Sequence, residues 1–321
     1  MTELLFIFWA INSILIVFTN RVYRIVIYFG IFSLITSVLH MFLGAPDVAI
    51  AEAAISAFAT VFLIVCVERY YAHVRDLTRE ETVTIVKGPI IQIVLPLMFA
   101  AVLLVLFFMH VPGVPVSSYL KDQYLTMFMY DVGGENAVTS IYLAYRVYDT
   151  LFEALILVVA VVAVSHMSWT EKTAVPDGRH SEIESSSAAK FTMRIICPII
   201  LLFGAYLMMN GHFSPGGGFQ GGLAVASFFI CRYLVHDIYD MPIKKVMRIE
   251  EMVFITIAML PIFTIFTAFV YLTVGVTPLF QNIYIIMMNV LIGLKVACGF
   301  FILFYRYVAI ERLHENDIAG G

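Results

Sequence analysis

The chain has 321 residues, of which 61% are hydrophobic and only 13% are charged; its formal net charge is -4 at pH 7 and its mean hydropathy is +0.94. A soluble domain needs far more charge on its surface, so this composition excludes a soluble globular protein. It predicts an integral, multi-pass membrane protein. We expect this protein in the cytoplasmic (inner) cell membrane, among membrane lipids and without a nucleic-acid partner.

The hydrophobic runs predict about nine transmembrane helices. A hydrocarbon core of about 30 Å needs roughly 20 residues at 1.5 Å each, and a helix closes its own backbone hydrogen bonds there. The predicted spans are 3–20, 22–43, 47–71, 89–111, 148–167, 191–209, 218–236, 250–274 and 278–305. The predicted fold is therefore all-α and polytopic. Thr2 and Glu3 precede the first run instead of a basic leader, so we expect this helix to be retained.

Basic residues of the predicted connections gather on one side of the membrane. About sixteen lie on one face, and only Lys121 and Arg146 lie on the other. By the positive-inside rule, the amino terminus is expected outside and the carboxyl terminus inside. Glu52 and Glu153 fall in the outer parts of spans, and ordinary topology does not explain these two acidic residues.

Two polar stretches divide the chain. The first ends at Gly88-Pro89, which predicts a break before a new helix. The second, 169–190, is rich in serine and charge, and predicts a flexible cytoplasmic linker. The expected modules are 1–80 with three spans, 89–168 with two spans and 190–312 with four spans.

Acidic side chains inside apolar runs are candidate ion carriers. An ionised carboxylate in the bilayer costs about 2.5 to 3.5 kcal/mol on insertion scales, so it marks a functional candidate. Asp47 follows Pro46 at the start of the third span, where it either stabilises the helix start or handles ions. Glu52 lies roughly 8 Å deeper, where a capping role is no longer available. Ion handling is therefore favoured for Glu52.

Three charged residues share one face of the fifth span. Arg146, Asp149 and Glu153 are separated by three and four residues. Arg146 is expected to act as the supporting charge partner of Asp149, which leaves Glu153 less compensated at about the depth of Glu52. We hypothesise that Glu52 and Glu153 face a common hydrated path and exchange protons or hold a cation. The alternative is a structural salt-bridge network around Arg146.

The stretch NGHFSPGGGFQGG, 210–222, is the most unusual feature of the chain. A phosphate loop needs a lysine and a Ser or Thr after its glycines, whereas Phe219 and Gln220 follow here. We expect Asn210-Gly211 to end a helix, and the glycines to allow a turn and close helix approach. The glycines of this predicted structural turn are Gly216, Gly217, Gly218, Gly221 and Gly222.

Other polar residues in apolar surroundings have open roles. Lys295 can relay protons, pair with a carboxylate of a partner subunit, or extend its amine to the membrane surface. His212 can titrate near neutral pH or serve as a hydrogen-bonded helix-end residue. Asn289 can hydrogen-bond between helices. The four cysteines lack the paired spacing of zinc or iron-sulfur sites, so no metal and no cofactor is expected.

Three motifs resemble modules of known ion-translocating complexes. GHFSPGGGFQGGL, 211–223, resembles the signature of the MnhB family, which forms the second subunit of Mrp-type Na⁺/H⁺ antiporters, and of a related subunit in energy-converting membrane-bound hydrogenases. GAPDVAIAEAAISA, 44–57, resembles the MbhD module found at the carboxyl-terminal end of the Mrp A protein. ENAVTSIYLAYRVYDTLFEA, 135–154, resembles its usual neighbour, MbhE. The three motifs occur in the order customary for this family.

The resemblance implies a transport subunit that catalyses no bond chemistry itself. Na⁺ and H⁺ would be the transported ions, with Glu52 and Glu153 as carriers. The implied partners are the other subunits of an Mrp-like antiporter or membrane-bound hydrogenase complex, including the large antiporter-like subunits, whose domain is not in this chain. The alternative is a structural adaptor that fastens larger subunits together. An autonomous channel is less favoured, because the chain has no evident repeat or selectivity-filter pattern.

Overall fold

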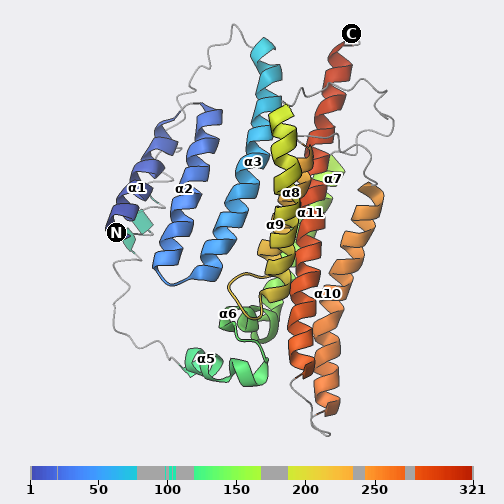
Figure 1. The fold of residues 1–321 in the computed structure, drawn as a ribbon. Helices are drawn as coiled ribbons and strands as arrows, with labels where there is room; N and C mark the ends of the chain where they lie inside the picture. Colours follow the sequence, from blue (N-terminus) through green and yellow to red (C-terminus); the bar gives the residue numbers. More distant parts are fainter. Residues whose placement is uncertain are drawn as a thin grey trace.

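The long helices of the protein run side by side, up and down along one axis (Figure 1). The computed structural model describes residues 2–19, 21–77, 98, 101–102, 104–105, 119–167, 187–233, 243–271 and 279–319. The helices are α1 (Thr2–Phe18), α2 (Val22–Phe42), α3 (Pro46–Leu77), α5 (Tyr119–Asp131), α6 (Ala137–Ser140), a π-helix (Ile141–Tyr145), α7 (Val147–Met167), α8 (Ser187–Asn210), α9 (Gly218–Tyr233), α10 (Ile243–Tyr271) and α11 (Leu279–Ala319).

The described residues confirm a helical, multi-pass membrane protein at a coarser level than predicted. Five helical segments are long and apolar enough to cross a membrane, namely Val22–Phe42, Pro46–Val65, Val147–His166, Phe191–Asn210 and Asn282–Arg306. The apolar helix α1 is shorter, with 17 residues. The count of nine spans and the orientation of the termini stay predictions. Most of the predicted span 89–111 and most of the linker 169–190 lie outside the described residues.

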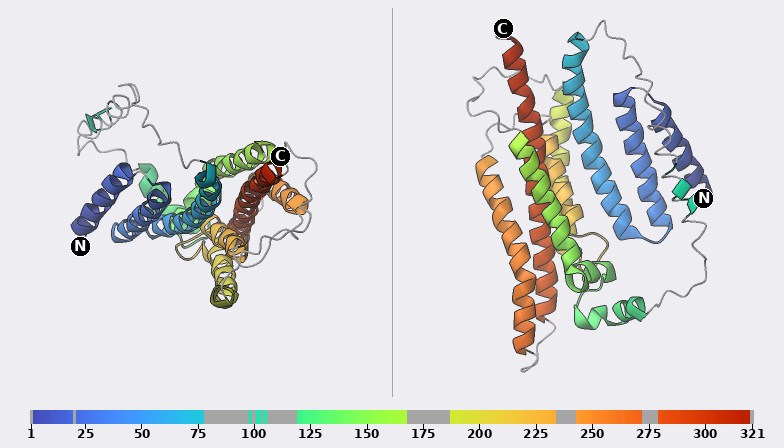
Figure 2. Two further views of the ribbon diagram at one scale, coloured as in Figure 1. Left: turned by 90° about the horizontal axis from the view of Figure 1, so that it is seen from above. Right: turned by 180° about the vertical axis from the view of Figure 1, so that it is seen from behind.

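The helices form a bundle and an attached row. In the bundle, α11 contacts α7, α8, α9 and α10. The helices α1, α2 and α3 stand in a single row, and α3 joins this row to α9 and α11 (Figure 2, left). Among the described helices, the row therefore joins the bundle at one end, whereas α11 is enclosed by its neighbours.

Burial follows this arrangement. On α11, Ile285, Met288, Ile292 and Val296 are buried at the spacing of one helix face. On α8, by contrast, large apolar side chains face outward, among them Phe191, Ile195, Ile199, Leu202, Tyr206 and Met209. Such a face would be unfavourable in water, but lipid chains or partner helices can cover it. The exposed apolar surface thus agrees with a membrane location.

Glycines let α9 pack tightly on two sides. A Cβ atom on Gly222 would lie 2.7 Å from Cβ of Val296 on α11. On the other side, a Cβ atom on Gly221 would lie 2.6 Å from the carbonyl oxygen of Gly204 on α8. Real Cβ atoms do not approach so closely, so both contacts depend on the missing side chain. Small residues thereby fix α9 between α8 and α11.

Candidate functional site

Asp47 joins three segments that lie far apart in the sequence. Its Oδ1 atom accepts a hydrogen bond from Nδ2 of Asn136 at 3.0 Å and from the N–H of Gly216 at 3.1 Å. Asp47 belongs to the first turn of α3, where a negative charge is also favoured by the helix dipole. We call this meeting point of α3, Asn136 and the glycine stretch the Asp47 junction. Asp47 therefore has a structural role at this junction. Ion handling by Asp47 stays a prediction.

Asn136 completes the Asp47 junction from the side of α6. Its Nδ2 atom also donates to the carbonyl oxygen of Ser214 at 3.1 Å. Its Oδ1 atom accepts from two backbone N–H groups of α6, at 2.9 and 3.3 Å, and so caps this short helix. Asn136 was not among the predicted site residues. Its capping role has a sequence signal, since an asparagine directly precedes a helical segment, but its bond to Asp47 has none.

His212 supports the same junction through its backbone. Its carbonyl oxygen accepts hydrogen bonds from the N–H groups of Glu135 and Asn136, both at 2.9 Å. In the part of the chain that the structure describes, the buried Nδ1 atom of its ring has no hydrogen-bond partner. The predicted proton-carrying role of His212 therefore stays a prediction.

Next to the junction, Asn289 holds the start of α9. Its side chain is 0% exposed, and its Oδ1 atom accepts from the N–H of Gly218 at 3.0 Å and from the hydroxyl of Tyr142 at 3.3 Å. Gly218 opens α9, so its N–H has no partner within the helix. Burial raises the pKa of the Tyr142 hydroxyl to about 12, which keeps it protonated as a donor. The predicted interhelical hydrogen bonding of Asn289 is confirmed.

The glycine stretch between α8 and α9 has backbone geometry that favours glycine. Gly216 has φ +136°, which residues with a side chain rarely adopt. At Gly218, a Cβ atom would lie 3.0 Å from Cβ of Ile292 on α11. Thr139 fixes the other end of the stretch, because its hydroxyl donates to the carbonyl oxygen of Gly211 at 2.7 Å. The stretch is thus a folded turn held by hydrogen bonds with Asp47, Asn136 and Thr139.

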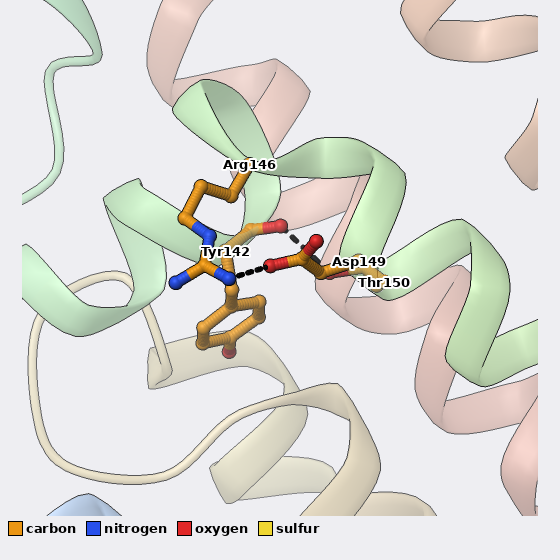
Figure 3. A network of polar contacts seen from close by, with 4 residues as sticks. All are labelled: Tyr142, Arg146, Asp149 and Thr150. Carbon is orange, nitrogen blue, oxygen red and sulfur yellow. Dashed lines mark hydrogen bonds and ion pairs between the residues drawn. The ribbon is translucent and has the colours of Figure 1, made fainter.

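A π-helix, Ile141–Tyr145, connects α6 to α7. Two of its carbonyl groups are bonded by side-chain hydroxyls. Thr150 donates to the carbonyl oxygen of Tyr142 at 2.6 Å (Figure 3), and Tyr284 donates to that of Leu143 at 3.0 Å. Such π-turns recur at functional sites, where they change the direction of the side chains that follow. Here the π-helix ends directly before Arg146, the first charged residue of the face that α7 continues with Asp149.

Arg146 and Asp149 form an ion pair at the start of α7 (Figure 3). The Nη2 and Oδ2 atoms are 2.5 Å apart, and the side chains are 62% and 53% exposed. Such exposed pairs contribute little stability, about 0 to 1 kcal/mol. The structure therefore contains the predicted charge pairing of Asp149 by Arg146, at the surface of the chain.

Glu52 and Glu153 lie on different helices and have different surroundings. Glu52 is half-buried on α3, and its Oε1 atom accepts a hydrogen bond from the hydroxyl of Ser33 on α2. Glu153 is exposed on α7. Within the described ranges, no hydrogen bond or ion pair links these two carboxylates. Their common hydrated path stays a prediction.

Lys295 is paired within the chain. Its Nζ atom lies 2.6 Å from Oε1 of Glu250 on α10, and the two side chains are 0% and 4% exposed. This burial rules out extension of the amine to the membrane surface. The carboxylate partner belongs to this chain and not to another subunit. This corrects the prediction that Lys295 pairs with a carboxylate of a partner subunit. Glu250 was missed because the predicted span began at this residue, whereas α10 begins two turns earlier, at Ile243.

Two family models match separate parts of the chain. One is the domain related to the MnhB subunit of the Na⁺/H⁺ antiporter, which matches residues 188–310. The other is MbhD, the D-type subunit of MBH, which matches residues 7–72. The resemblances to MnhB and MbhD are thereby confirmed, and the chain carries both kinds of domain. The resemblance of 135–154 to MbhE stays a prediction.

Known proteins and structures resemble the chain in the same way. The B-type subunit of the Na⁺/H⁺ antiporter of Alkalihalophilus pseudofirmus is 42% identical over 82 residues, which cover 26% of this chain and 54% of that protein. The chain spans about half to three fifths of the length of such curated relatives. The Mrp complex of Dietzia sp. DQ12-45-1b gives a TM-score of 0.68 at 20% identity, over 95% of this chain and 34% of that chain.

A second solved structure is the membrane-bound sulfane sulfur reductase, an archaeal respiratory membrane complex. It gives a TM-score of 0.53 at 26% identity, over 66% of this chain and 95% of that chain. The protein thus shares its fold with chains of an Mrp complex and of a respiratory membrane complex.

Proposed function

We propose that the chain is an integral subunit of an Mrp-like complex that exchanges Na⁺ for H⁺ across the cell membrane. Its partners there are the other subunits of such a complex, including large antiporter-like subunits, or those of a related membrane-bound respiratory complex. The MnhB-related and MbhD domains support the transport class, and the two structural matches support the multisubunit setting.

One observation carries the proposed role in ion transfer. Glu52 and Glu153 lie inside Pro46–Val65 and Val147–His166, two segments that are long and apolar enough to cross a membrane. A carboxylate at such a depth is costly unless water, a proton or a cation reaches it. Glu52 accepts a hydrogen bond from Ser33, and Glu153 is exposed on α7 without a bonded partner among the described residues. These surroundings support the proposal that both carboxylates exchange a proton or Na⁺.

The charges at the start of α3 and α7 suit the entrance of this path. Asp47 and Asp149 each lie about one turn to two turns before Glu52 and Glu153 along their helices. Acidic groups at a mouth raise the local concentration of cations. Arg146 offsets one of these charges, so that Asp149 is partly neutralised and Glu153 is not.

Glu153→Gln tests the proposed ion-transfer role in the complete complex. Inverted membrane vesicles would be given Na⁺, and the change in internal pH would be followed with a fluorescent dye. We expect Na⁺-dependent proton exchange to fall by about tenfold or more, because the amide cannot exchange a proton, while the amount of assembled complex is unchanged. Glu3→Gln is the matched control, since Glu3 is an exposed acid in the first turn of α1.

A structural-adaptor function is the second candidate, and the row of α1, α2 and α3 favours it. Among the described residues, many large apolar side chains of this row are exposed. Normal exchange in an assembled Glu153→Gln complex would exclude Glu153 from the ion path and favour the adaptor. Exchange of K⁺ in place of Na⁺ by the wild-type complex would change the proposed cation.

A further inference from the structure

The bundle contains a second intramembrane charge site, made of Glu250 and Lys295. Lys295 lies about midway along Asn282–Arg306, the most enclosed of the candidate membrane segments. Its Nζ atom is 2.6 Å from Oε1 of Glu250, and neither side chain has more than 4% of its surface exposed. The pair thus combines short hydrogen-bond geometry with nearly complete burial in the middle of the bundle.

Stability alone is a weak explanation for such a pair. Taking two charges out of water is costly, and apolar side chains of similar volume often pack as well or better. A buried ion pair differs from apolar side chains in that it can be neutralised internally. When the proton on Nζ moves to Oε1, an amine and a carboxylic acid replace the two ions, and no charge is left in the apolar surroundings.

The pair has few polar neighbours. Nζ lies 5.9 Å from the centre of the Phe254 ring on α10, and Cys298 is one turn further along α11. Arg306, nearer the carboxyl end of α11, directs Nη2 toward the sulfur of Met247 at 3.7 Å. On the side of α9, Gly222 packs against Val296, and on the side of α8, Met208 packs against Gly293.

On the side of α7, the nearest charged residue along the helix is Glu153. A Cβ atom on Gly299 of α11 would lie 2.9 Å from Cδ2 of Leu157, so α7 and α11 touch at this level. The two helices run in the same direction (Figure 2, right). Glu153 and Lys295 each precede this contact by four residues, about 6 Å along their helices. They therefore lie at the same depth on neighbouring helices.

We propose that Glu250 and Lys295 form a proton-exchanging pair that responds to the charge at Glu153. The proton moves from Nζ of Lys295 to Oε1 of Glu250 and back, which interconverts an ion pair and a neutral amine with a carboxylic acid. Arrival of a cation or proton at Glu153 removes a negative charge at the depth of Lys295 and favours the neutral amine. This inference rests on the proposed function and deepens it, because it adds the step that follows Glu153.

Lys295→Arg in the complete complex tests the pair. Arginine keeps the positive charge and can bond to Glu250, but it does not release a proton in proteins. We expect the complex to assemble and Na⁺-dependent proton exchange to fall by about tenfold or more. Exchange within about twofold of wild type would overturn the inference. Lys245→Arg, an exposed lysine on α10, is the matched control and should leave exchange unchanged.

A second variant covers the case in which arginine does not fit. Glu250→Gln/Lys295→Met removes both charges and keeps similar volumes, so assembly is expected to be retained. A purely structural pair would then be dispensable, and normal exchange would overturn the inference. Loss of exchange in an assembled complex would support it.

If neither variant assembles, infrared difference spectra of the wild-type complex test the inference. Addition of Na⁺ should produce a carboxylic-acid band that shifts in Glu250→Asp, and absence of such a band would overturn the inference. Absence of any cation-dependent exchange by the wild-type complex would overturn the proposed function as well. Normal exchange by Lys295→Arg would overturn this inference alone.

Discussion

Asn289 shows how a single buried amide can organise the start of a helix. Its oxygen is shared by the N–H of Gly218 and the hydroxyl of Tyr142, which come from α9 and from the π-helix before α7. Both donors are buried or nearly so, and a buried donor without an acceptor is costly. The amide therefore connects the glycine stretch to the segment that leads into α7.

Asn289→Ala should destabilise the protein by about 1 to 3 kcal/mol, because the N–H of Gly218 would lose its acceptor inside the bundle. The midpoint of thermal unfolding of the purified complex measures this loss. Asn282→Ala is the matched control on the same helix, since the Oδ1 atom of Asn282 is buried and has no partner within the described residues. Equal midpoints for the two variants would contradict the role given to Asn289.

At this scale, the sequence predicts which residues are unusual but not their partners. Lys295 and Asn289 stand out because they are polar residues in an apolar run. Glu250, the partner of Lys295, is 45 residues away, and only the packing of α10 against α11 brings the two together. Asn136 and Asp47 are 89 residues apart. Such pairs depend on which helices become neighbours, and no local periodicity contains this information.

At the scale of the elements, the position of α9 depends on the absence of side chains on two of its sides. It has glycine contacts with α8 on one side and with α11 on the other, through Gly221 and Gly222. Close approach of this kind gives dense packing between helices in a membrane, where water provides no hydrophobic driving force. The glycine stretch therefore shapes the turn and also the first two turns of the helix that follows.

Gly222→Ala should destabilise the contact between α9 and α11 by about 1 to 3 kcal/mol, because the new methyl group would overlap the backbone of Gly293 and the side chain of Val296. A lower midpoint of thermal unfolding would measure the effect. Ser227→Ala on the same helix is the control, since it removes only a hydroxyl bonded to the carbonyl oxygen of Leu223 within α9. A Gly222→Ala complex as stable as this control would show that the helices can move apart without loss.

The hydrophobic runs of the sequence predict that a helix exists. The ends of helices and the irregular turns depend on tertiary contacts, which the sequence does not show. The run predicted at 278–305 belongs to α11, but this helix continues to Ala319, past the end of the apolar run. The π-helix has no sequence signal of its own. It depends on hydroxyl groups of Thr150 and Tyr284 that bond its carbonyl groups, and Tyr284 comes from the far end of the chain.

Over the whole molecule, the row of α1, α2 and α3 is attached to the bundle along one edge. Among the described residues of this row, those of α3 make the extensive contact with the bundle, through α9 and α11 (Figure 2). The Asp47 junction lies at the end of this edge, where Asp47 accepts hydrogen bonds from Asn136 and Gly216. One carboxylate therefore fastens the MbhD domain to the turn of the MnhB-related domain.

Asp47→Ala should weaken this attachment by roughly 2 kcal/mol or more, because it removes a charged acceptor of two hydrogen bonds at a helix start. Asp47→Asn keeps an oxygen at the same position and should lose less than half as much. Thermal unfolding of the purified complex compares the two variants, and equal midpoints would contradict a fastening role. Proton exchange then separates the two roles of Asp47: loss of exchange in an Asp47→Asn complex of normal stability would add ion handling, whereas normal exchange would leave Asp47 as a fastener of the two domains.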